Sequence, residues 1–214
     1  MKNLLVDFIS NAELTDGMAG ISSFLNEVER QRIDTLLWST DGYKPVVSFA
    51  IAFTEDAILL KFFVAEKYVE PNYHQINDPV YKDSCVEFFI AFGDDKSYYN
   101  LEFNAIGIAL IGYGADKTHR ELLHKSVISK IRSEHTIDLL SGDKNIPAWE
   151  LTLSIPFTVF VHNNIVSLTG KDCRGNFYKC GDDLPDPHFL SWSAINYPQP
   201  NFHLPQFFGS IRFV

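Results

Sequence analysis

The sequence predicts an all-β protein, an antiparallel β-sandwich or jelly roll with one short N-terminal helix. Aromatic residues make up 14% of the chain, including 18 Phe and 9 Tyr, and such residues are enriched in strands. About ten to twelve short runs of alternating apolar and polar residues are separated by turn residues. Helical spacing of apolar residues is clear in a single segment. Together these three observations favour the sandwich class.

The length and composition are those of a folded domain. The chain has 214 residues, of which 46% are hydrophobic, and this is enough to bury a sizeable core. We find no internal repeat, low-complexity run or linker in the sequence. We therefore predict one domain over residues 1–214.

The charge balance restricts the partners. The formal net charge is -9, and Lys and Arg do not cluster along the sequence. A basic patch is the usual sign of a nucleic-acid surface, and basic segments also mediate binding to anionic membranes. The sequence therefore predicts neither partner and favours a neutral or cationic ligand. The oligomeric state cannot be read from it.

The cysteines and the N-terminus indicate a cytoplasmic protein. Cys85, Cys173 and Cys180 are an odd number and lack the CxxC spacing of zinc sites, so we interpret them as free thiols. The segment MKNLLVDFIS is interrupted by Asp7 and lacks a cleavage site, so it does not resemble a signal peptide. No apolar run reaches transmembrane length. We expect cytoplasmic localisation, or secretion if an export sequence has been removed from this terminus.

In the first third of the chain, the residues to about Gly20 show no regular pattern. A helix follows, because Ile21, Phe24, Leu25 and Val28 recur at helical spacing. Alternating residues then predict strands at 33–38, 46–53 and 57–64. Residues 66–82 contain two prolines and three tyrosines and predict a long exposed loop, a kind of segment that is often functional.

The remaining two thirds predict further short strands. After the hairpin discussed below, we expect a strand at 108–113, a helical turn at 119–124, and two strands at 127–137 and 148–155 with Ser141, Gly142 and Asp143 between them. Residues 157–161 predict a turn at the edge of the sandwich. The last predicted strands are 165–169, 176–180, 188–195 and 210–214. Residues 196–208 are rich in Pro and aromatic residues and predict a loop.

The segment DSCVEFFIAFGDDKSYYNLEFNAIGIALIGYG, from Asp83 to Gly114, predicts a hairpin. With the loop at 93–96, Phe92 pairs with Ser97, Glu87 with Glu102, and Cys85 with Asn104. Because side chains alternate along a strand, one face is apolar and the other carries polar groups. The polar residues of that second face are Glu87, Asn100, Glu102 and Asn104.

Two interpretations of this polar face stay open. Like charges directly opposite each other destabilise a sheet, so the facing pair Glu87 and Glu102 indicates a function such as binding hydroxyl groups, holding a cation or acid–base chemistry. The alternative is the ordinary wet face of an amphipathic hairpin. A glycosidase also uses two carboxyls, but they must flank the scissile bond, whereas these two project side by side from one sheet.

The aromatic residues of the loops form a second group, which comprises Tyr73, Tyr81, Tyr197, Phe202 and His203. Sugar rings have flat apolar C–H faces that stack on aromatic rings, so loop aromatics above a polar sheet face are the arrangement that a sugar requires. The alternative is that these rings cap the end of the core.

Other catalytic motifs are absent from the sequence. The seven histidines show no HExxH spacing, and there is no GxSxG elbow, P-loop or dinucleotide fingerprint. Asp83, Asp94 and Asp95 lie close enough in sequence to contribute to a calcium site, although no EF-hand pattern is present. No metal ligand set follows from these residues.

Several segments resemble the family 9 carbohydrate-binding modules, from about Trp38 to Val214. They are DSCVEFF, YYNLEFNAIG, GNFYKCGD, PHFLSW and FFGSIRF, which occur in the order expected for that family. The resemblance implies a β-sandwich that binds sugars, in xylanase-associated members at the reducing ends of plant polysaccharides. It also implies a structural calcium ion, whose ligands we cannot match to this chain.

The resemblance places candidate binding residues in this sequence. The polar groups fall on Glu87, Glu102, Asn104 and Tyr178, and the two aromatic clamp positions fall on Tyr81 and Phe202. Lys179 and His203 would then help at the rim. Neither clamp position is tryptophan, Glu102 stands where the xylanase-associated modules carry an arginine, and Tyr178 stands where they carry an amide.

The leading hypothesis is therefore non-catalytic binding of a xylan- or glucan-derived saccharide, with no cofactor required. A second is a glycoside hydrolase that uses Glu87 and Glu102. A third is an interaction or structural module without a sugar ligand, which gains support if Tyr81 and Phe202 are packed into the domain and leave no groove.

Overall fold

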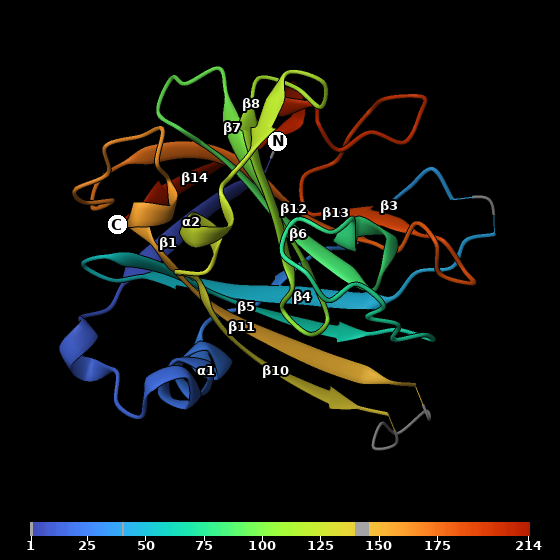
Figure 1. Ribbon diagram of the computed structural model, residues 1–214, viewed down its shortest axis with the longest axis horizontal. Coiled ribbons are helices and arrows are strands. Elements are labelled where there is room, and N and C mark those ends of the chain that lie inside the picture. The colour runs from blue at the N-terminus through green and yellow to red at the C-terminus, as the bar shows by residue number, and fades with distance from the viewer. Residues whose placement is uncertain (1, 40, 140–145) are drawn as a thin grey trace.

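The computed structural model describes residues 2–39, 41–139 and 146–214. Within these residues, 14 strands form one continuous sheet that curls into two facing layers (Figure 1). The predicted all-β sandwich is confirmed, with helices at its periphery.

The first layer follows the order β10-β11-β5-β4. Its strands are β10 (Arg132–Asp138), β11 (Ala148–Pro156), β5 (Ala57–Ala65) and β4 (Val46–Phe53), and β2 (Gln31–Arg32) pairs with β4. These strands pair antiparallel.

The second layer follows the order β14-β12-β6-β7-β8-β9. Its strands are β14 (Gly209–Phe213), β12 (Asp172–Cys180), β6 (Cys85–Phe92), β7 (Tyr98–Asn104), β8 (Ala109–Gly114) and β9 (Arg120–Leu122). Two short strands extend it beside the last residues of β12, namely β13 (Phe189–Ser191) and β3 (Thr35–Leu37).

The N-terminal strand β1 (Asn3–Phe8) joins the two layers. Residues Asn3–Val6 pair with β14, and Asp7–Phe8 pair with β4, in both cases in parallel. The prediction of an irregular start was wrong, and these parallel pairs depart from the predicted antiparallel arrangement. The local signal is weak because only Leu4 and Val6 of this strand are buried.

The core lies between the layers and consists of their inward-facing apolar side chains. Phe177 of β12 stacks on Phe88 of β6 with ring centroids 4.6 Å apart, and on Phe49 of β4 at 3.7 Å. The alternation of Val86, Phe88 and Ile90 in β6 directs all three inward, where they are fully buried. The apolar face of the predicted hairpin is therefore the inner face of the second layer.

The predicted helix is confirmed as α1 (Gly17–Glu27). Ile21 and Leu25 lie on one face of it and pack on Ala50 and Leu59 of the first layer, and Figure 1 shows the helix against the outer side of this layer. The other helices are short: α2 (Lys125–Ile128) and four single 3-10 turns at Asn11–Glu13, Val80–Lys82, Phe157–Val159 and Pro205–Phe207. No described helix has the length and apolar character needed to span a membrane.

Three further local predictions differ from the structure. The helical turn predicted at 119–124 contains β9, and the start of the predicted 127–137 strand belongs to α2, which the His124 side chain caps by accepting from the Ser126 N–H. Residues 165–169 form no strand, since Val166 there is 80% exposed and contributes nothing to the core. The predicted turn at 141–143 lies outside the described residues.

The hairpin register is confirmed. Glu87 lies opposite Glu102, and Cys85 opposite Asn104. Their face of the second layer is not solvated, however, since Glu87 is 3% exposed and Glu102 is 2% exposed. The loops around residues 66–84 and 196–208 cover it, and their apolar side chains form a second buried cluster with Phe89, Tyr98 and Tyr178 of the sheet. This covered outer face holds the candidate site.

Candidate functional site

A pocket of about 140 Å³ opens on the outer face of the second layer. Glu87, Glu102 and Cys180 form its floor, and each comes from a different strand of the sheet. The remaining lining is aromatic or polar and comes from loops and short strands: Trp38, Tyr81, Lys117, Arg120, Asp182, Phe189, Pro200, Asn201, Phe202 and His203. This volume is several times the minimum of about 10–15 Å³ that a single water molecule requires, so the pocket has room for a small ligand.

The Glu102 carboxylate is held at one oxygen and free at the other. Its Oε1 accepts from Asn100 Nδ2 at 2.9 Å and from Arg120 Nη1 at 3.3 Å. Its Oε2 is buried and has no hydrogen-bond partner among the described residues. A buried acceptor without a partner costs free energy, so this oxygen is available to a ligand donor.

Arg120 reaches Glu102 from β9 across the intervening strand β8. Gly112 of β8 makes this possible, because a Cβ at that position would lie 3.2 Å from the Arg120 Cδ and 2.8 Å from the Asn100 Oδ1. Either separation is closer than ordinary van der Waals contact. A glycine at residue 112 therefore allows the guanidinium to lie over the sheet.

A hydrogen-bond chain continues from Arg120 to the opposite wall. Arg120 Nη1 lies 3.3 Å from His203 Nε2, and His203 Nδ1 lies 2.9 Å from the Tyr98 hydroxyl. An arginine can only donate, so Nε2 accepts and the proton resides on Nδ1, which donates to Tyr98. Burial, and then the charge of Arg120, lower the pKa of His203 to about 3. The imidazole is therefore neutral at physiological pH.

The two floor carboxyls hold their protons more tightly than exposed glutamates. Burial raises the pKa of Glu102 to about 7, although Arg120 and Asn100 counteract this. Burial and the neighbouring Glu102 raise the pKa of Glu87 well above its ordinary value. The Cys180 thiol donates to Glu87 Oε1 at 3.2 Å. Near neutral pH the pair carries at most one full negative charge.

Aromatic rings form the walls. Phe202 stacks on Tyr178 with centroids 4.2 Å apart, and Trp38 lies 5.8 Å from Phe202 and 5.9 Å from Phe189. The Trp38 Nε1–H donates to the backbone oxygen of Tyr197, which ties the indole to the 196–208 loop. Trp38 also has a φ of 48°, a conformation that non-glycine residues rarely adopt and that is enriched at functional sites.

Five of the eight predicted binding residues come together at this pocket: Tyr81, Glu87, Glu102, Phe202 and His203. Asn104 and Tyr178 lie behind it. The amide of Asn104 donates to Asp83 and to the Tyr73 backbone oxygen and accepts from the Ile108 N–H, so it anchors the 66–84 loop. The Tyr178 hydroxyl donates to the backbone oxygen of Phe202 and supports that ring from below.

The predicted position of Lys179 at the rim was wrong. Because side chains alternate along β12, Lys179 points to the side of the sheet opposite Tyr178 and Cys180. Its Nζ forms an ion pair with Glu66 Oε2 at 2.8 Å, and the Lys179 and Glu66 side chains are both fully buried. The same Nζ donates to His188 Nε2 at 2.9 Å. Lys179 therefore links the two layers and does not line the pocket.

The sequence analysis missed Trp38 and Arg120, the two largest additions to the site. Both lie outside the hairpin segment and reach the pocket through pairing of short strands, β3 with β13 and β9 with β8. Arg120 places a positive charge beside Glu102, and Trp38 adds an indole to the lining of the pocket. The one available signal in the sequence was the lack of a tryptophan at residues 81 and 202 and of an arginine at residue 102.

The three aspartates considered for a calcium site do not converge. Asp83 is buried and accepts from the Tyr73 N–H and the Asn104 amide, while Asp95 accepts from Ser97 and Tyr113. Among the described residues, one group of three acidic, His or Cys side chains brings its ligand atoms together, and it consists of Cys85, Glu87 and Cys180. All three cysteines of the chain are buried and free.

Comparisons with solved structures reveal the same architecture. A candidate carbohydrate-binding protein from Bacteroides uniformis ATCC 8492 is 38% identical with a TM-score of 0.89, over 100% of this chain and 99% of that one. A family 9 carbohydrate-binding module from Caldicellulosiruptor kristjanssonii is similar in two complexes. With glucose the TM-score is 0.61 at 13% identity, covering 100% of this chain and 96% of that one. In the complex with cellotriose the TM-score is 0.59 at 12% identity, covering 99% of this chain and 93% of that one. The latter two similarities establish the fold alone.

The comparison of sequences leads to the same family. No curated protein matches this chain. The model described as carbohydrate-binding family 9 matches residues 21–213, nearly the whole length, which agrees with the resemblance seen in the hairpin and C-terminal motifs. The chain belongs to carbohydrate-binding family 9.

Proposed function

We propose that the pocket binds one sugar ring of a saccharide, without cleaving it. The observation that carries the proposal is the buried Glu102 Oε2, which has no hydrogen-bond partner among the described residues and belongs to a side chain that lines the pocket. A sugar hydroxyl is a neutral donor of the right kind, and charged acceptors form the stronger hydrogen bonds. Its binding would remove the cost of the unpaired oxygen.

The other residues that line the pocket match both the hydroxyl groups and the apolar C–H face of a pyranose ring. Glu87, Arg120 and Asn201 offer donors and acceptors to hydroxyl groups, while the faces of Trp38 and Phe202 suit the apolar C–H surface. The net charge of -9 and the acidic floor favour a neutral sugar over an anionic one. The Caldicellulosiruptor module was solved with glucose and with cellotriose, so glucose and short β-glucans are the first ligands to test.

The glycoside hydrolase alternative is less well supported. Glu87 and Glu102 are cross-strand partners on one face of the sheet, and both lie in the floor of the pocket. A glycosidase needs an acid and a nucleophile or base on either side of the scissile bond. Two carboxyls that project side by side can hold hydroxyls of one ring but are poorly placed to flank a bond.

The interaction-module alternative predicts that Tyr81 and Phe202 leave no groove. Phe202 is 8% exposed and packs on Tyr178, as that alternative requires. The pocket nevertheless stays open beside it, with Tyr81 half-buried in the wall. This favours a small ligand over a protein surface.

Calorimetric titration with glucose, cellobiose, cellotriose and xylotriose tests the proposal. We expect the wild type to bind at least one of them, and Glu102→Gln to bind it roughly ten- to a hundredfold more weakly, since a hydrogen bond to a charged group contributes ~1.5–3 kcal/mol. Glu121→Gln is the matched control, because Glu121 is exposed on β9 and lies outside the pocket.

Product analysis of the same mixtures separates binding from hydrolysis. We expect cellotriose and xylotriose to remain intact. Release of reducing sugar that Glu87→Gln abolishes would replace the binding proposal by the hydrolase. Absence of binding to every saccharide, with correctly folded protein, would favour the interaction module instead.

A further inference from the structure

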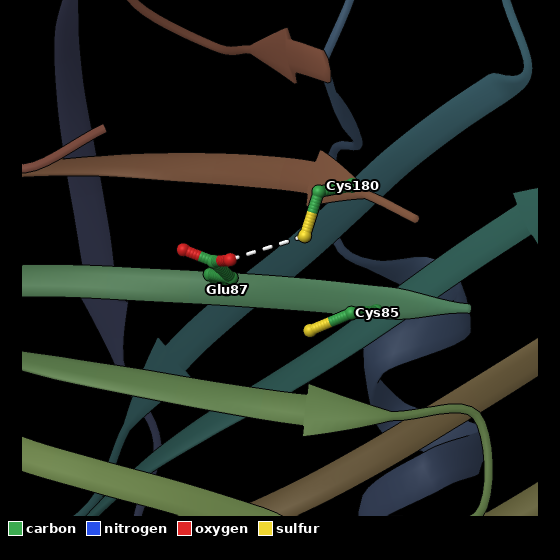
Figure 2. A group of neighbouring side chains, drawn as sticks. All are labelled: Cys85, Glu87 and Cys180. Atoms are coloured by element: carbon green, nitrogen blue, oxygen red, sulfur yellow. Dashed lines mark hydrogen bonds between the residues drawn. The ribbon is translucent and has the colours of Figure 1, made fainter. Parts of the chain in front are cut away.

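We propose that Cys85, Glu87 and Cys180 form a binding site for a zinc ion beneath the sugar pocket. The three ligand atoms, two Sγ and one carboxylate oxygen, all lie within 4.8 Å of one another. Figure 2 shows both sulfur atoms turned toward the Glu87 carboxylate. The proposal rests on the proposed function only where it concerns the effect on sugar binding.

The sheet itself brings these donors together. Cys85 and Glu87 are two residues apart in β6 and therefore share its outer face. Cys180 of β12 lies directly opposite Cys85 in the antiparallel pair. All three donors therefore come from two hydrogen-bonded strands of the sheet, and a metal site built on strands is positioned more precisely than one built on loops.

The spacing suits tetrahedral zinc. With Zn–S distances of about 2.3 Å and Zn–O distances of about 2.0–2.2 Å, neighbouring ligands in a tetrahedron are roughly 3.6–3.8 Å apart. The limit of 4.8 Å on the present separations leaves at most a small inward movement of side chains. The Sγ of Cys180 already lies 3.2 Å from Glu87 Oε1.

The donor chemistry selects the metal. Two thiolates with one carboxylate suit a borderline-soft ion such as zinc, whereas calcium and magnesium require oxygen ligands. In the metal-free protein the buried Glu87 carboxyl is paired with a thiol, which is a weak donor. A cation at this point would compensate the burial of the carboxyl much better.

Metal binding exchanges protons for the ion. Burial raises the pKa of Cys85 to about 12 and that of Cys180 well above its usual value, so both thiols are protonated beforehand. Zn²⁺ enters, the two thiol protons and the Glu87 proton leave to solvent, and no oxidation takes place. Cys85 and Cys180 thereby become thiolate ligands.

The site has three protein ligands and one open side. Glu87 and Cys180 line the pocket, whereas Cys85 is fully buried behind them. The fourth position of a zinc ion would therefore face the pocket, and a water molecule or a sugar hydroxyl would fill it. Zinc and the sugar would then affect each other's affinity by the same factor.

Spectroscopy of the full-length protein under reducing conditions tests the site, with Co²⁺ and Zn²⁺ as probes. We expect one equivalent of Co²⁺ to give the visible bands of tetrahedral cobalt and thiolate charge-transfer bands, and one equivalent of Zn²⁺ to abolish them. X-ray absorption of the zinc form should show two sulfur ligands at about 2.3 Å. Calcium should produce no competition.

The variants separate this site from accidental binding. We expect Cys180→Ser and Cys85→Ser to weaken zinc binding by about 100-fold or more. Cys173→Ser is the matched control, because Cys173 is also a buried cysteine of β12 but faces the core. Circular dichroism checks the fold of each variant, and Glu87→Gln provides an independent test if a serine variant unfolds.

Two results would overturn the proposal: no tetrahedral cobalt spectrum in folded, reduced wild type, or zinc binding that survives Cys180→Ser but is lost in Cys173→Ser. Failure of every sugar to bind would not mimic either result, because the metal titrations contain no sugar. A repeat with a bound saccharide then measures the coupling as a change in zinc affinity.

Discussion

At the scale of single residues, the site depends on charges that the fold holds out of water. Glu87 and Glu102 face each other across two central strands, and Arg120 contacts one of them, leaving Glu102 Oε2 unpaired. Such an arrangement costs stability in the absence of a ligand, and active and binding sites commonly carry this cost. This cost can be measured through the raised pKa of Glu102.

The first prediction concerns the pH dependence of stability. The folded pKa of Glu102 is raised to about 7 from 4.5, so the folded state binds the proton more tightly than the unfolded state. The protonated form of Glu102 therefore stabilises the folded state. This contribution is fully present below the unfolded pKa of 4.5 and is lost as the pH rises toward and through 7. The loss is on the order of 3 kcal/mol. Urea denaturation from pH 4.5 to 8 measures it.

The variant Glu102→Gln removes this titration. We expect a flatter dependence of unfolding free energy on pH in the variant, and greater stability than wild type at pH 8. Glu29→Gln, at an exposed position outside the pocket, should follow the wild-type curve. Parallel curves for wild type and Glu102→Gln would show that Glu102 ionises with an ordinary pKa.

A second prediction at this scale concerns Trp38. The indole lines the pocket and is the largest aromatic ring there. Aromatic contacts contribute ~0.5–1.5 kcal/mol beyond the area they bury, so we expect Trp38→Ala to weaken the affinity for a bound saccharide by roughly tenfold. Tyr197→Ala is the control, because it keeps the backbone oxygen that Trp38 contacts and lies outside the pocket. Equal affinities in a titration would exclude stacking on Trp38.

At the scale of elements, β12 serves both sides of the second layer. Tyr178 and Cys180 face the pocket side, whereas Phe177 and Lys179 face the first layer. Lys179 pairs there with Glu66, which follows β5 and also accepts from Trp149 Nε1 of β11. Burial, and then Lys179, lower the pKa of His188 to about 3, so the neutral imidazole accepts from the lysine. One strand thus supports the site and connects the layers.

The third prediction is that Lys179→Met destabilises the protein strongly. Removing one partner of a buried ion pair leaves the other charge without compensation, at a cost of about 3–5 kcal/mol. Urea denaturation at pH 7 measures the loss, with Lys171→Met as the control because Lys171 is exposed just before β12. The double variant Glu66→Gln with Lys179→Met should recover part of the stability. A loss below about 1 kcal/mol would show that the pair contributes little.

At the scale of the whole molecule, β1 converts two sheets into one. It pairs in parallel with β14 and then with β4 (Figure 1). Through these pairs it covers one edge of each layer, and exposed strand edges are otherwise sites of aggregation. Leu4 and Val6 point into the core while Leu5 points outward.

The fourth prediction uses this alternation. Leu4 is 7% exposed and Leu5 is 66% exposed. We expect Leu4→Ala to cost ~2–5 kcal/mol of unfolding free energy, the usual range for a buried leucine. Leu5→Ala should stay within about 0.5 kcal/mol of wild type. Similar losses in the two variants, measured by urea denaturation, would contradict the observed register of β1.

The sequence predicted correctly the elements that depend on residues close together in the chain, and failed for those that depend on distant residues. The register of β6 with β7 was predictable because the two strands are joined by a short turn and alternate regularly. The end of α1, β4 and β5 were predictable for the same local reason. The strands β1 and β9 and the helix α2 were not, because they have two, no and one buried side chains respectively and depend on distant partners.

The same distinction applies to the site. The alternation of residues by itself determined that Glu87 and Glu102 share one face, and the order of motifs indicated the family. Only the tertiary structure decided that loops bury this face, that Arg120 and Trp38 complete the pocket, and that Lys179 pairs with Glu66 between the layers. Periodicity within a strand is a local property that the sequence displays directly. Which loop covers a sheet, and which charge reaches across it, depends on contacts between segments far apart in the chain.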